Sequence, residues 1–320
     1  MYQSHFGLRE EPFGVTPDGR FFYQSAQHRE ALATLYYAIE QRRGFALLLG
    51  GAGLGKTSVL FTLAQMLKSR VQIAYLANPY YDRTTVLDAV LASLGLEPGA
   101  SPAASHKAFY QYLSKIHTTG KTVAVLFDEA QDLNRDTLEA IRMLSNFETP
   151  DAKLMQIVLA AQPRLGDTLA QPDCEQIRQR LSAIARLEPL EECGVPEYMA
   201  HRLRTAGGSI DLFTGGAVGA IASASRGVPR NVNTICYNSL ALAYALGKHQ
   251  VDVGEVTEVL RDLDLPSVDA ALPQPAGAVA PARTLTQTAR KRRSAWIVGG
   301  IALLAACWLL LSWLWFWKRP

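Results

Sequence analysis

The feature that most constrains this chain is the loop GGAGLGKT at residues 50–57. It matches the pattern G-x-x-x-x-G-K-[ST] in full, and it lies between a short apolar run and a sequence with helical periodicity. Glycines let a backbone curve closely around phosphate oxygens, and the following helix adds its positive N-terminus. The loop therefore predicts an ATP site between a buried strand and a helix. The expected ATP-binding residues are Gly50, Gly51, Ala52, Gly53, Leu54, Gly55, Lys56, Thr57 and Ser58.

Two side chains of this loop have specific expected roles. Lys56 would place its charge between the β- and γ-phosphates, and Thr57 would offer its hydroxyl to Mg²⁺. The expected cofactors are therefore ATP and Mg²⁺. A glycine-rich turn that matches by chance is the alternative, but such a turn would not need a strand before it and a helix after it.

Two adjacent acids, Asp128 and Glu129, follow the strongest strand pattern of the chain, TVAVLF at residues 122–127. In phosphate-loop enzymes an acid at this place holds Mg²⁺, and a second acid can orient and polarise the attacking water. We expect Asp128 to bind Mg²⁺ together with Thr57, and Glu129 to act as the general base. The alternative is a surface Asp–Glu pair at the start of a loop.

Strands and helices alternate through the first part of the chain. Continuous apolar strands separated by helices are typical of a parallel α/β sheet that is covered on both faces. The expected strands are 44–51, 71–79, 122–127, 154–163 and 183–190, and the expected helices are 25–42, 57–67, 82–94, 105–117, 136–147 and 173–182. After Pro189 only helical patterns follow, at 194–206, 211–225, 229–246 and 251–262. These patterns predict a nucleotide-binding α/β domain at 1–190 and a small helical lid domain at 191–265.

The C-terminal part has a different composition. Residues 266–294 form a Pro/Ala-rich linker with a basic end, residues 295–317 are an expected transmembrane helix, and 318–320 are a short tail. The 22 residues from 296 to 317 contain no charge. At about 1.5 Å per residue they span the hydrocarbon core, which is about 30 Å thick. A buried helix of the soluble fold is the alternative, but this segment has no polar face.

Charges around that segment predict its direction. Five basic residues precede it and two follow it: Arg283, Arg290, Lys291, Arg292 and Arg293, then Lys318 and Arg319. The positive-inside bias then places the ATPase head in the cytoplasm and the C-terminus on the far side of a single-pass protein.

The charge of the head argues against a dedicated DNA-binding protein. The whole chain has 32 basic and 29 acidic residues, but the tail from residue 266 holds seven basic residues and one acidic residue. Residues 1–265 therefore carry a net charge of −3, without the positive field that nucleic acid attracts. The four cysteines form no CxxC pair, so the sequence offers neither a zinc motif nor a disulfide framework.

Four further residues are less specific candidates. Gln162 ends the strand after that of Asp128, where it would lie beside the γ-phosphate or simply be a polar strand end. Arg178 and Arg180 would both point outward from the helix expected at 173–182, either as functional groups or as a solvated face. Arg230 lies in the first turn of an expected lid helix, where a salt bridge is the alternative.

Several segments together resemble one family, the AAA+ ATPases of the ExeA/GspA group, over about residues 1–265. The segments are FGLREEPFGVTPDGRFFY near the start, HREAL at 28–32, the phosphate loop, LFDEAQ at 126–131, AAQPRL at 160–165, RQRL at 178–181 and GVPRNVN at 227–233. The group is associated with general secretion and envelope assembly. Members devoted to secretin assembly carry a peptidoglycan-binding region beyond the membrane segment, so the three residues after residue 317 make a direct cell-wall role unexpected.

The resemblance implies roles that spacing alone does not. Asp128 and Glu129 become the Mg²⁺-binding and water-activating acids, and the segment around Phe13 and His28 lies near the adenine. Gln162 takes the first sensor position, Arg230 is the lid sensor, and Arg180, or else Arg178, is the arginine finger that reaches the ATP of a neighbouring subunit.

The leading hypothesis is a membrane-anchored ATPase that forms a homo-oligomer, either a ring or a filament, with ATP at subunit interfaces. Its partners would be envelope or secretion-complex proteins. The first alternative is an ATP-dependent regulatory switch that acts on DNA or a transposition-like target, which nucleic-acid-stimulated ATPase activity would distinguish. An inactive scaffold is a third possibility, disfavoured by the intact phosphate loop and acids.

Overall fold

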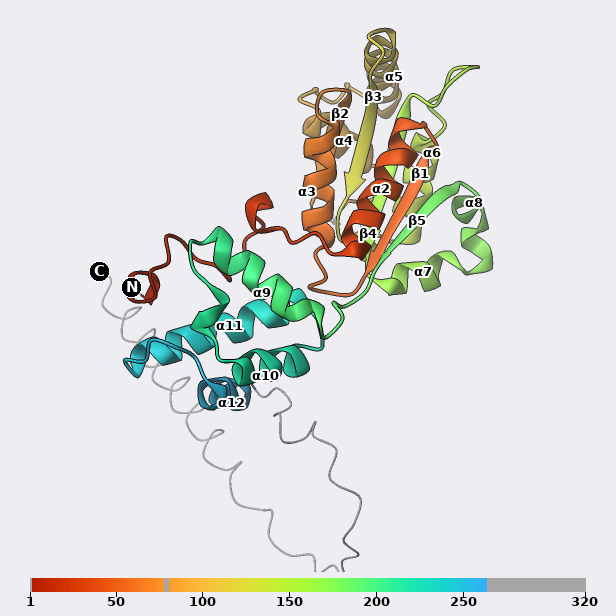
Figure 1. Cartoon of the computed structure of the whole chain (residues 1–320). Coiled ribbons are helices and arrows are strands. Elements are labelled where there is room, and N and C mark those ends of the chain that lie inside the picture. The colour runs from red at the N-terminus through yellow and green to blue at the C-terminus, as the bar shows by residue number, and fades with distance from the viewer. Residues whose placement is uncertain (1, 78–80, 264–320) are drawn as a thin grey trace, which may run out of the picture. The chain divides into compact units, whose positions relative to one another are not determined.

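The computed structural model describes residues 2–77 and 81–263, which contain a parallel five-stranded sheet and a set of helices beyond it (Figure 1). The strands are β1 (Phe45–Gly50), β2 (Val71–Leu76), β3 (Thr122–Phe127), β4 (Met155–Ala161) and β5 (Leu181–Leu187). All neighbouring strands are parallel, in the order β2-β3-β4-β1-β5. This order places the carboxyl ends of β3, β4 and β1 next to one another. The predicted parallel α/β sheet is confirmed.

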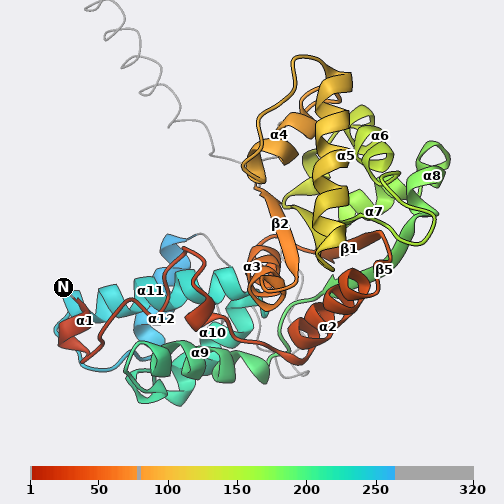
Figure 2. The same ribbon diagram turned by 90° about the horizontal axis from the view of Figure 1, so that it is seen from above.

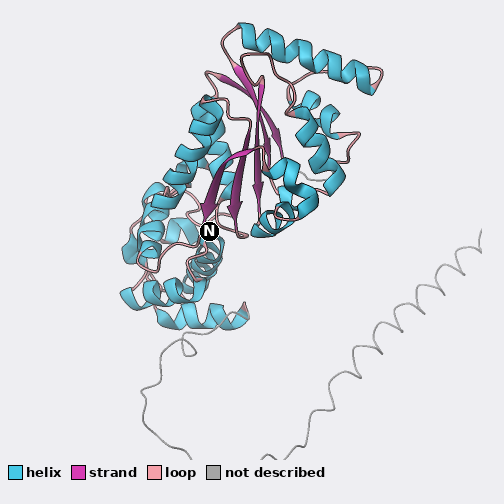
Figure 3. Cartoon of the chain, turned by 90° about the vertical axis from the view of Figure 1, so that its right-hand side faces the viewer, coloured by secondary structure: helices cyan, strands magenta, loops and turns pink. Residues whose placement is uncertain are grey.

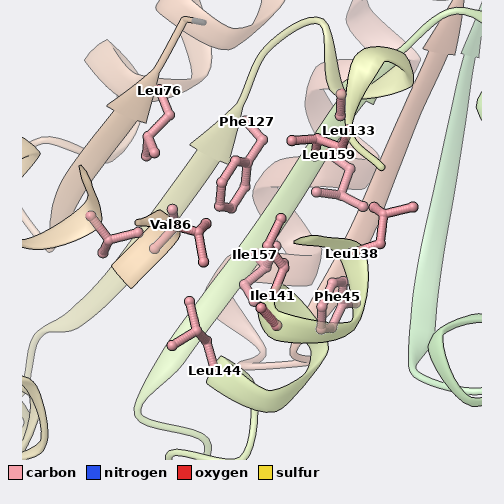
Figure 4. Close-up of a cluster of buried hydrophobic side chains, with 14 of the residues drawn as sticks. Phe45, Leu76, Val86, Phe127, Leu133, Leu138, Ile141, Leu144, Ile157 and Leu159 are labelled. Atoms are coloured by element: carbon pink, nitrogen blue, oxygen red, sulfur yellow. The ribbon is translucent and has the colours of Figure 1, made fainter. Parts of the chain in front are cut away.

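Helices cover both faces of the sheet, as predicted (Figure 3). Side chains alternate between the faces along each strand. Ala46, Leu48 and Leu126 pack against α2 (Ala26–Glu40) and α3 (Lys56–Leu67). The opposite face, which includes Phe45, Phe127 and Ile157, packs against four further helices (Figure 4). These are α4 (Val86–Ser93), α5 (Pro102–Thr118), α6 (Arg135–Leu144) and α7 (Pro163–Leu169).

Helix starts follow ordinary capping chemistry except at the phosphate loop. The side chains of Ser25, Ser101 and Asn134 accept hydrogen bonds from the first turns of α2, α5 and α6. In contrast, α3 follows Gly55, which has a left-handed φ of 90° and provides no side-chain cap. The first amides of α3 are therefore available to an anion.

The helical part is a bundle of α9 (Gly194–Thr205), α10 (Gly215–Ser225), α11 (Pro229–Ala245) and α12 (Val253–Asp262). It follows β5 through residues 188–193, and the boundary predicted at 190 falls in this connection. The N-terminal segment, including α1 (Tyr2–His5), lies along this bundle (Figure 2). Phe6, Leu8 and Phe13 join the bundle's hydrophobic cluster, although the sequence interpretation grouped them with the sheet. The amino-terminal segment therefore contributes its apolar side chains to the helical part.

The helix expected at 173–182 is wrong over its second half. A 3-10 turn, η3 (Pro172–Cys174), leads into the single turn of α8 (Glu175–Arg178), and β5 begins at Leu181. Ile184, which lies in the strand expected at 183–190, pairs with Leu47 of β1 and is 48% exposed. Residues 181–187 instead pair with β1 and complete the edge of the sheet, a long-range contact that local apolar spacing does not specify.

Among residues 2–77 and 81–263 no helix is both long and apolar enough to cross a membrane. The linker predicted at 266–294, the transmembrane helix predicted at 295–317 and the tail at 318–320 lie outside the described residues.

Candidate functional site

A cavity of about 420 Å³ lies where the phosphate loop, the N-terminal segment and the helical bundle meet. The phosphate loop contributes residues 53–58, and the N-terminal segment contributes residues 14–18 and 21–23. The remaining wall consists of His28, Glu129, Leu190, Tyr198, Arg202, Pro229, Arg230 and Asn233. The cavity therefore brings together residues as far apart in the sequence as Gly14 and Asn233, and its volume is in the range expected of a small-ligand site.

Lys56 is buried, and its side chain turns back over the phosphate loop. Its Nζ donates hydrogen bonds to the carbonyl oxygens of Gly50 at 3.1 Å and Gly51 at 3.2 Å. Burial lowers the pKa of Lys56, the nearby Arg230 lowers it further, and the two acids Glu129 and Asp128 oppose this change. The ammonium group is thus placed among the loop amides, where phosphate oxygens would replace the carbonyls as its acceptors.

Thr57 and Asp128 meet through their side chains, as the sequence predicted for a shared metal site. The hydroxyl of Thr57 donates to Oδ2 of the buried Asp128 at 2.6 Å. Hard oxygen donors of this kind are the ligands that Mg²⁺ takes, so these two residues fit the expected ion. Tyr75, on β2, also donates its hydroxyl to Oδ2 of Asp128, at 2.9 Å. Burial and the charge of Asp128 raise the pKa of Tyr75, which keeps its hydroxyl a donor.

Glu129 follows directly and lies on the wall of the cavity. Its backbone is left-handed, with φ 51° and ψ 35°, and it precedes the 3-10 turn η2 (Ala130–Asp132). Its Oε2 accepts a hydrogen bond from Nε2 of Gln131 at 2.6 Å. This location beside the phosphate loop agrees with the general-base role, which remains a prediction.

Gln162 stands at the end of β4, between the strands that carry the phosphate loop and Asp128. Its backbone N–H donates to Oε1 of Gln131 at 2.9 Å. Gln162 does not line the cavity, whereas Glu129 does. The position of Gln162 in the sheet is the one expected for a sensor, and the role itself stays a prediction.

Neither arginine of the expected finger pair lies on the cavity wall. Nη1 of Arg180 donates to Oγ of Ser145 at 2.6 Å, and Nη1 of Arg178 donates weakly to the carbonyl of Ala170 at 3.4 Å. Arg180 follows the end of α8, and Arg178 is its last residue. Neither side chain therefore reaches the cavity of its own chain, and the finger role stays a prediction.

Arg230 comes from the first turn of α11, and its exposed side chain lines the cavity. Its backbone N–H donates to the carbonyl of Gly53 at 3.3 Å. A Cβ at Gly53, where φ is +78°, would lie 2.7 Å from Cβ of Arg230, so only glycine fits there. Lys56 and Arg230 thus bring two positive charges to one cavity from opposite sides.

Sequence reasoning expected Phe13 and His28 near the adenine. Phe13 is buried in the bundle, and the residues that follow it, 14–18, line the cavity instead. His28 is buried on the cavity wall, with Nδ1 2.7 Å from Oγ of Ser25 and Nε2 3.1 Å from the carbonyl of Leu54. Burial lowers the pKa of His28, so the neutral ring supports the phosphate loop.

Polar residues of the bundle that the sequence interpretation missed also reach this cavity. The hydroxyl of Tyr198 donates to Oδ1 of Asn233 at 2.7 Å, and Nη1 of Arg202 donates to Tyr198 Oη at 3.0 Å. Arg202 also donates to the carbonyls of Pro12 and Gly14 and so holds the N-terminal segment. The available signal was the pair of polar residues four positions apart, 198 and 202, on the buried side of an expected helix.

Two comparisons with known sequences bear on this site. Residues 39–169 match the family model of an AAA domain. The protein named General secretion pathway protein A, from Aeromonas hydrophila, is 38% identical over 259 residues, which are 80% of this chain and 47% of that protein. The chain thus spans about half the length of this curated relative.

Solved structures with the same fold have much lower sequence identity. Cdc6p from Pyrobaculum aerophilum aligns with a TM-score of 0.60 at 17% identity, over 78% of this chain and 70% of that one. The ORC2 protein of Aeropyrum pernix aligns with a TM-score of 0.61 at 14% identity, over 79% and 71%. The RuvB Holliday junction branch migration motor of Thermotoga maritima aligns at 0.52 and 18%, over 76% and 73%. At these identities the likeness shows the fold alone.

Proposed function

We propose that this chain, which carries an AAA domain at residues 39–169 and is 38% identical to General secretion pathway protein A, is a membrane-anchored ATPase whose hydrolysis cycle drives or regulates assembly of a secretion or envelope complex. The nucleotide would bind between neighbouring copies of the chain. The membrane anchor and the role in assembly are additional to ATP hydrolysis and have their own tests.

The observation that carries the proposed mechanism is the convergence of four groups on one cavity: Lys56, the Thr57–Asp128 pair, Glu129 and Arg230. The loop amides and Lys56 would bind the phosphates, and Arg230 would contact them from the helical side. Mg²⁺, held by Thr57 and Asp128, would neutralise charge on the phosphate oxygens. Glu129 would take the proton of the attacking water.

The positions of Arg178 and Arg180 support a site shared between copies. A finger arginine acts on the ATP of a neighbouring subunit, so it is not expected to line the nucleotide cavity of the chain that carries it. Both side chains lie away from the cavity of their own chain and close to the surface at α8. A homo-oligomer, in a ring or a filament, would bring one of them to the next nucleotide.

The membrane part rests on the sequence of residues 295–317 and its flanking charges. The partner class rests on the name of the 38% identical relative, which refers to the general secretion pathway. A DNA target is less favoured, because residues 1–265 carry more acidic than basic side chains.

The proposal can be tested with the full chain in its native membrane. Glu129→Gln should bind ATP and scarcely hydrolyse it, so it should hold its partners in the ATP-bound state. After solubilisation, the Glu129→Gln variant should co-purify with secretion or envelope components when ATP is present. Lys56→Ala should lose them. Equal recovery with both variants, or hydrolysis by Glu129→Gln at the wild-type rate, would contradict the proposal.

Topology is tested separately. A reporter active only outside the cytoplasm should be active when fused after Pro320 and inactive when fused before Met1. Release of the intact chain by a carbonate wash would show that residues 295–317 do not span the membrane.

A further inference from the structure

We propose that Gln131 is the positioning residue for Glu129, and that it links the direction of the Glu129 carboxylate to the first turn of α7. The inference rests on the proposed general-base role of Glu129 and adds to it a residue that controls where the base points.

Gln131 uses both ends of its side-chain amide. Its Nε2 donates to Oε2 of Glu129 at 2.6 Å, and its Oε1 accepts from the backbone N–H of Gln162 at 2.9 Å. A primary amide can donate and accept at the same time, which neither a carboxylate nor an apolar side chain can do. A single half-buried side chain therefore joins the end of β3 to the end of β4.

The backbone of Glu129 is fixed, since its N–H donates to Oδ1 of Asp128 at 2.9 Å, and the direction of its carboxylate therefore depends on a partner of the side chain. Glu129 lies in the left-handed region at φ 51°, at the start of a turn rather than in a strand or a long helix. Among the described residues, Gln131 is the only side chain that hydrogen-bonds to its carboxylate, and it does so at Oε2. Oε1 of Glu129 is thereby left to accept a proton from a water in the cavity.

A second contact ties the same turn to α7. Nε2 of Gln131 also donates to Oδ2 of Asp132 at 3.2 Å, and Oδ1 of Asp132 pairs with Arg164 in the first turn of α7. Gln162 is the N-cap residue of the same helix, and its backbone N–H, not its side chain, donates to Gln131. A displacement of α7 would therefore move Gln131 and with it the carboxylate of Glu129.

Two substitutions separate the two bonds of Gln131. Gln131→Glu keeps an oxygen for the amide of Gln162, but it replaces the donor to Glu129 with a second carboxylate. Gln131→Met fills a similar volume and loses both bonds. Gln250→Ala is the matched control, because it removes a glutamine amide that donates at 2.8 Å to the carbonyl of Asp211 in the distant bundle.

The experiment measures kcat, KM and the dissociation constant of ATP for the purified full chain. Both Gln131 variants should lower kcat about 10- to 100-fold, the usual size of effects from a misplaced catalytic group, with ATP affinity within about twofold of wild type. Gln250→Ala should match wild type in all three quantities. A retained ATP affinity also shows that each variant is folded.

The outcomes are distinguishable. If Gln131→Glu keeps the wild-type kcat while Gln131→Met is slow, Gln131 only fastens α7 to the sheet, and the inference is overturned. It is also overturned if ATP affinity falls and kcat does not, or if both variants are as fast as wild type while Glu129→Gln is inactive. If Glu129→Gln itself hydrolyses ATP at the wild-type rate, the proposed role of Glu129 fails first.

Discussion

On both sides of the nucleotide cavity polar side chains are hydrogen-bonded to one another, but those on the sheet side follow buried strands or open α3, whereas those on the helical side come from α9 and α11. Thr57 reaches Asp128 at 2.6 Å, and Gln131 reaches Glu129 at the same distance. Among the described residues, α11 meets the phosphate loop through one backbone hydrogen bond, from Arg230 to Gly53 at 3.3 Å.

This difference indicates which side is fixed before ATP arrives. Strand ends in a sheet with apolar layers on both faces can hardly move without disrupting the core. The helical side has its own hydrophobic cluster and follows β5 through a short connection. We therefore expect the helical side to move as a unit when nucleotide binds, while the sheet side keeps the geometry for phosphate and metal.

The largest expected effect is on the hydrolysis rate and comes from Arg180, which would act on the ATP of a neighbouring copy. Arg180→Ala should retain ATP binding and lose hydrolysis by about 10³- to 10⁵-fold, the range measured for finger arginines in other nucleotide hydrolases. Steady-state ATPase rates and ATP titrations on the full chain would measure both quantities. Mixing Arg180→Ala with Glu129→Gln should restore some activity, because an intact site can form at mixed interfaces.

A wild-type rate for Arg180→Ala together with an inactive Arg178→Ala would assign the finger to Arg178. If neither substitution changes the rate, no neighbouring copy contributes an arginine, and the site consists only of the sheet side and the helical side of one chain.

Removing the central phosphate contact on the sheet side should have the next largest effect. Lys56→Ala should weaken ATP binding at least about 100-fold, since hydrogen bonds to charged groups contribute about 1.5–3 kcal/mol each. Isothermal titration calorimetry would measure the loss. Lys68→Ala is the control, because this exposed lysine lies at the other end of the same helix. Unchanged affinity for Lys56→Ala would place the phosphates elsewhere.

The corresponding change on the helical side should be weaker. Arg230→Ala should cost about tenfold in ATP affinity, or ~1.4 kcal/mol, because its exposed guanidinium contributes charge with little desolvation. The same titration measures it, with the exposed Arg261→Ala of α12 as the control. A loss as large as that of Lys56→Ala would break the comparison, since the helical side would then hold the phosphates as firmly as the sheet side does.

Residue types in a fixed order were enough to predict one part of the molecule. The phosphate loop, Asp128 and Glu129 were found because each needs a particular chemistry at the end of an apolar strand. The strand order β2-β3-β4-β1-β5 did not follow, since it depends on which distant strands pair.

Contacts made by side chains from different elements were harder to predict. Tyr75 and Gln131 act through hydrogen bonds at 2.9 and 2.6 Å that no local pattern specifies. The helix expected at 173–182 has a simpler cause: apolar residues at 177 and 181 fit a helical spacing, and pairing with β1 extends the strand expected at 183–190 back to residue 181. The packing of Phe6 and Phe13 in the bundle likewise depended on the tertiary structure.

The smallest expected effect concerns His28, which supports the phosphate loop from α2. Burial lowers its pKa below the ordinary value of about 6.5. Below that pH the unfolded chain therefore binds a proton that the folded chain resists, so the unfolded state holds more protons and stability falls as the pH is lowered. His201, near the N-terminal segment, also has a lowered pKa, first through burial and then through Arg204 and Arg202.

His28→Gln and His201→Gln should therefore each reduce the loss of stability between pH 7.5 and pH 5.5, measured as the shift of the denaturant midpoint. Their effects on ATP should differ. Nε2 of His28 lies 3.1 Å from the carbonyl of Leu54 in the phosphate loop, so His28→Gln should also weaken ATP binding by about two- to threefold at pH 7.5, as expected for a hydrogen bond worth ~0.5 kcal/mol. His201→Gln should leave ATP affinity unchanged, because among the described residues the ring of His201 packs against Tyr23 and has no hydrogen bond to the phosphate loop. If His201→Gln weakens ATP binding more than His28→Gln does, the helical side governs the loop, and the fixed sheet side would no longer explain the site.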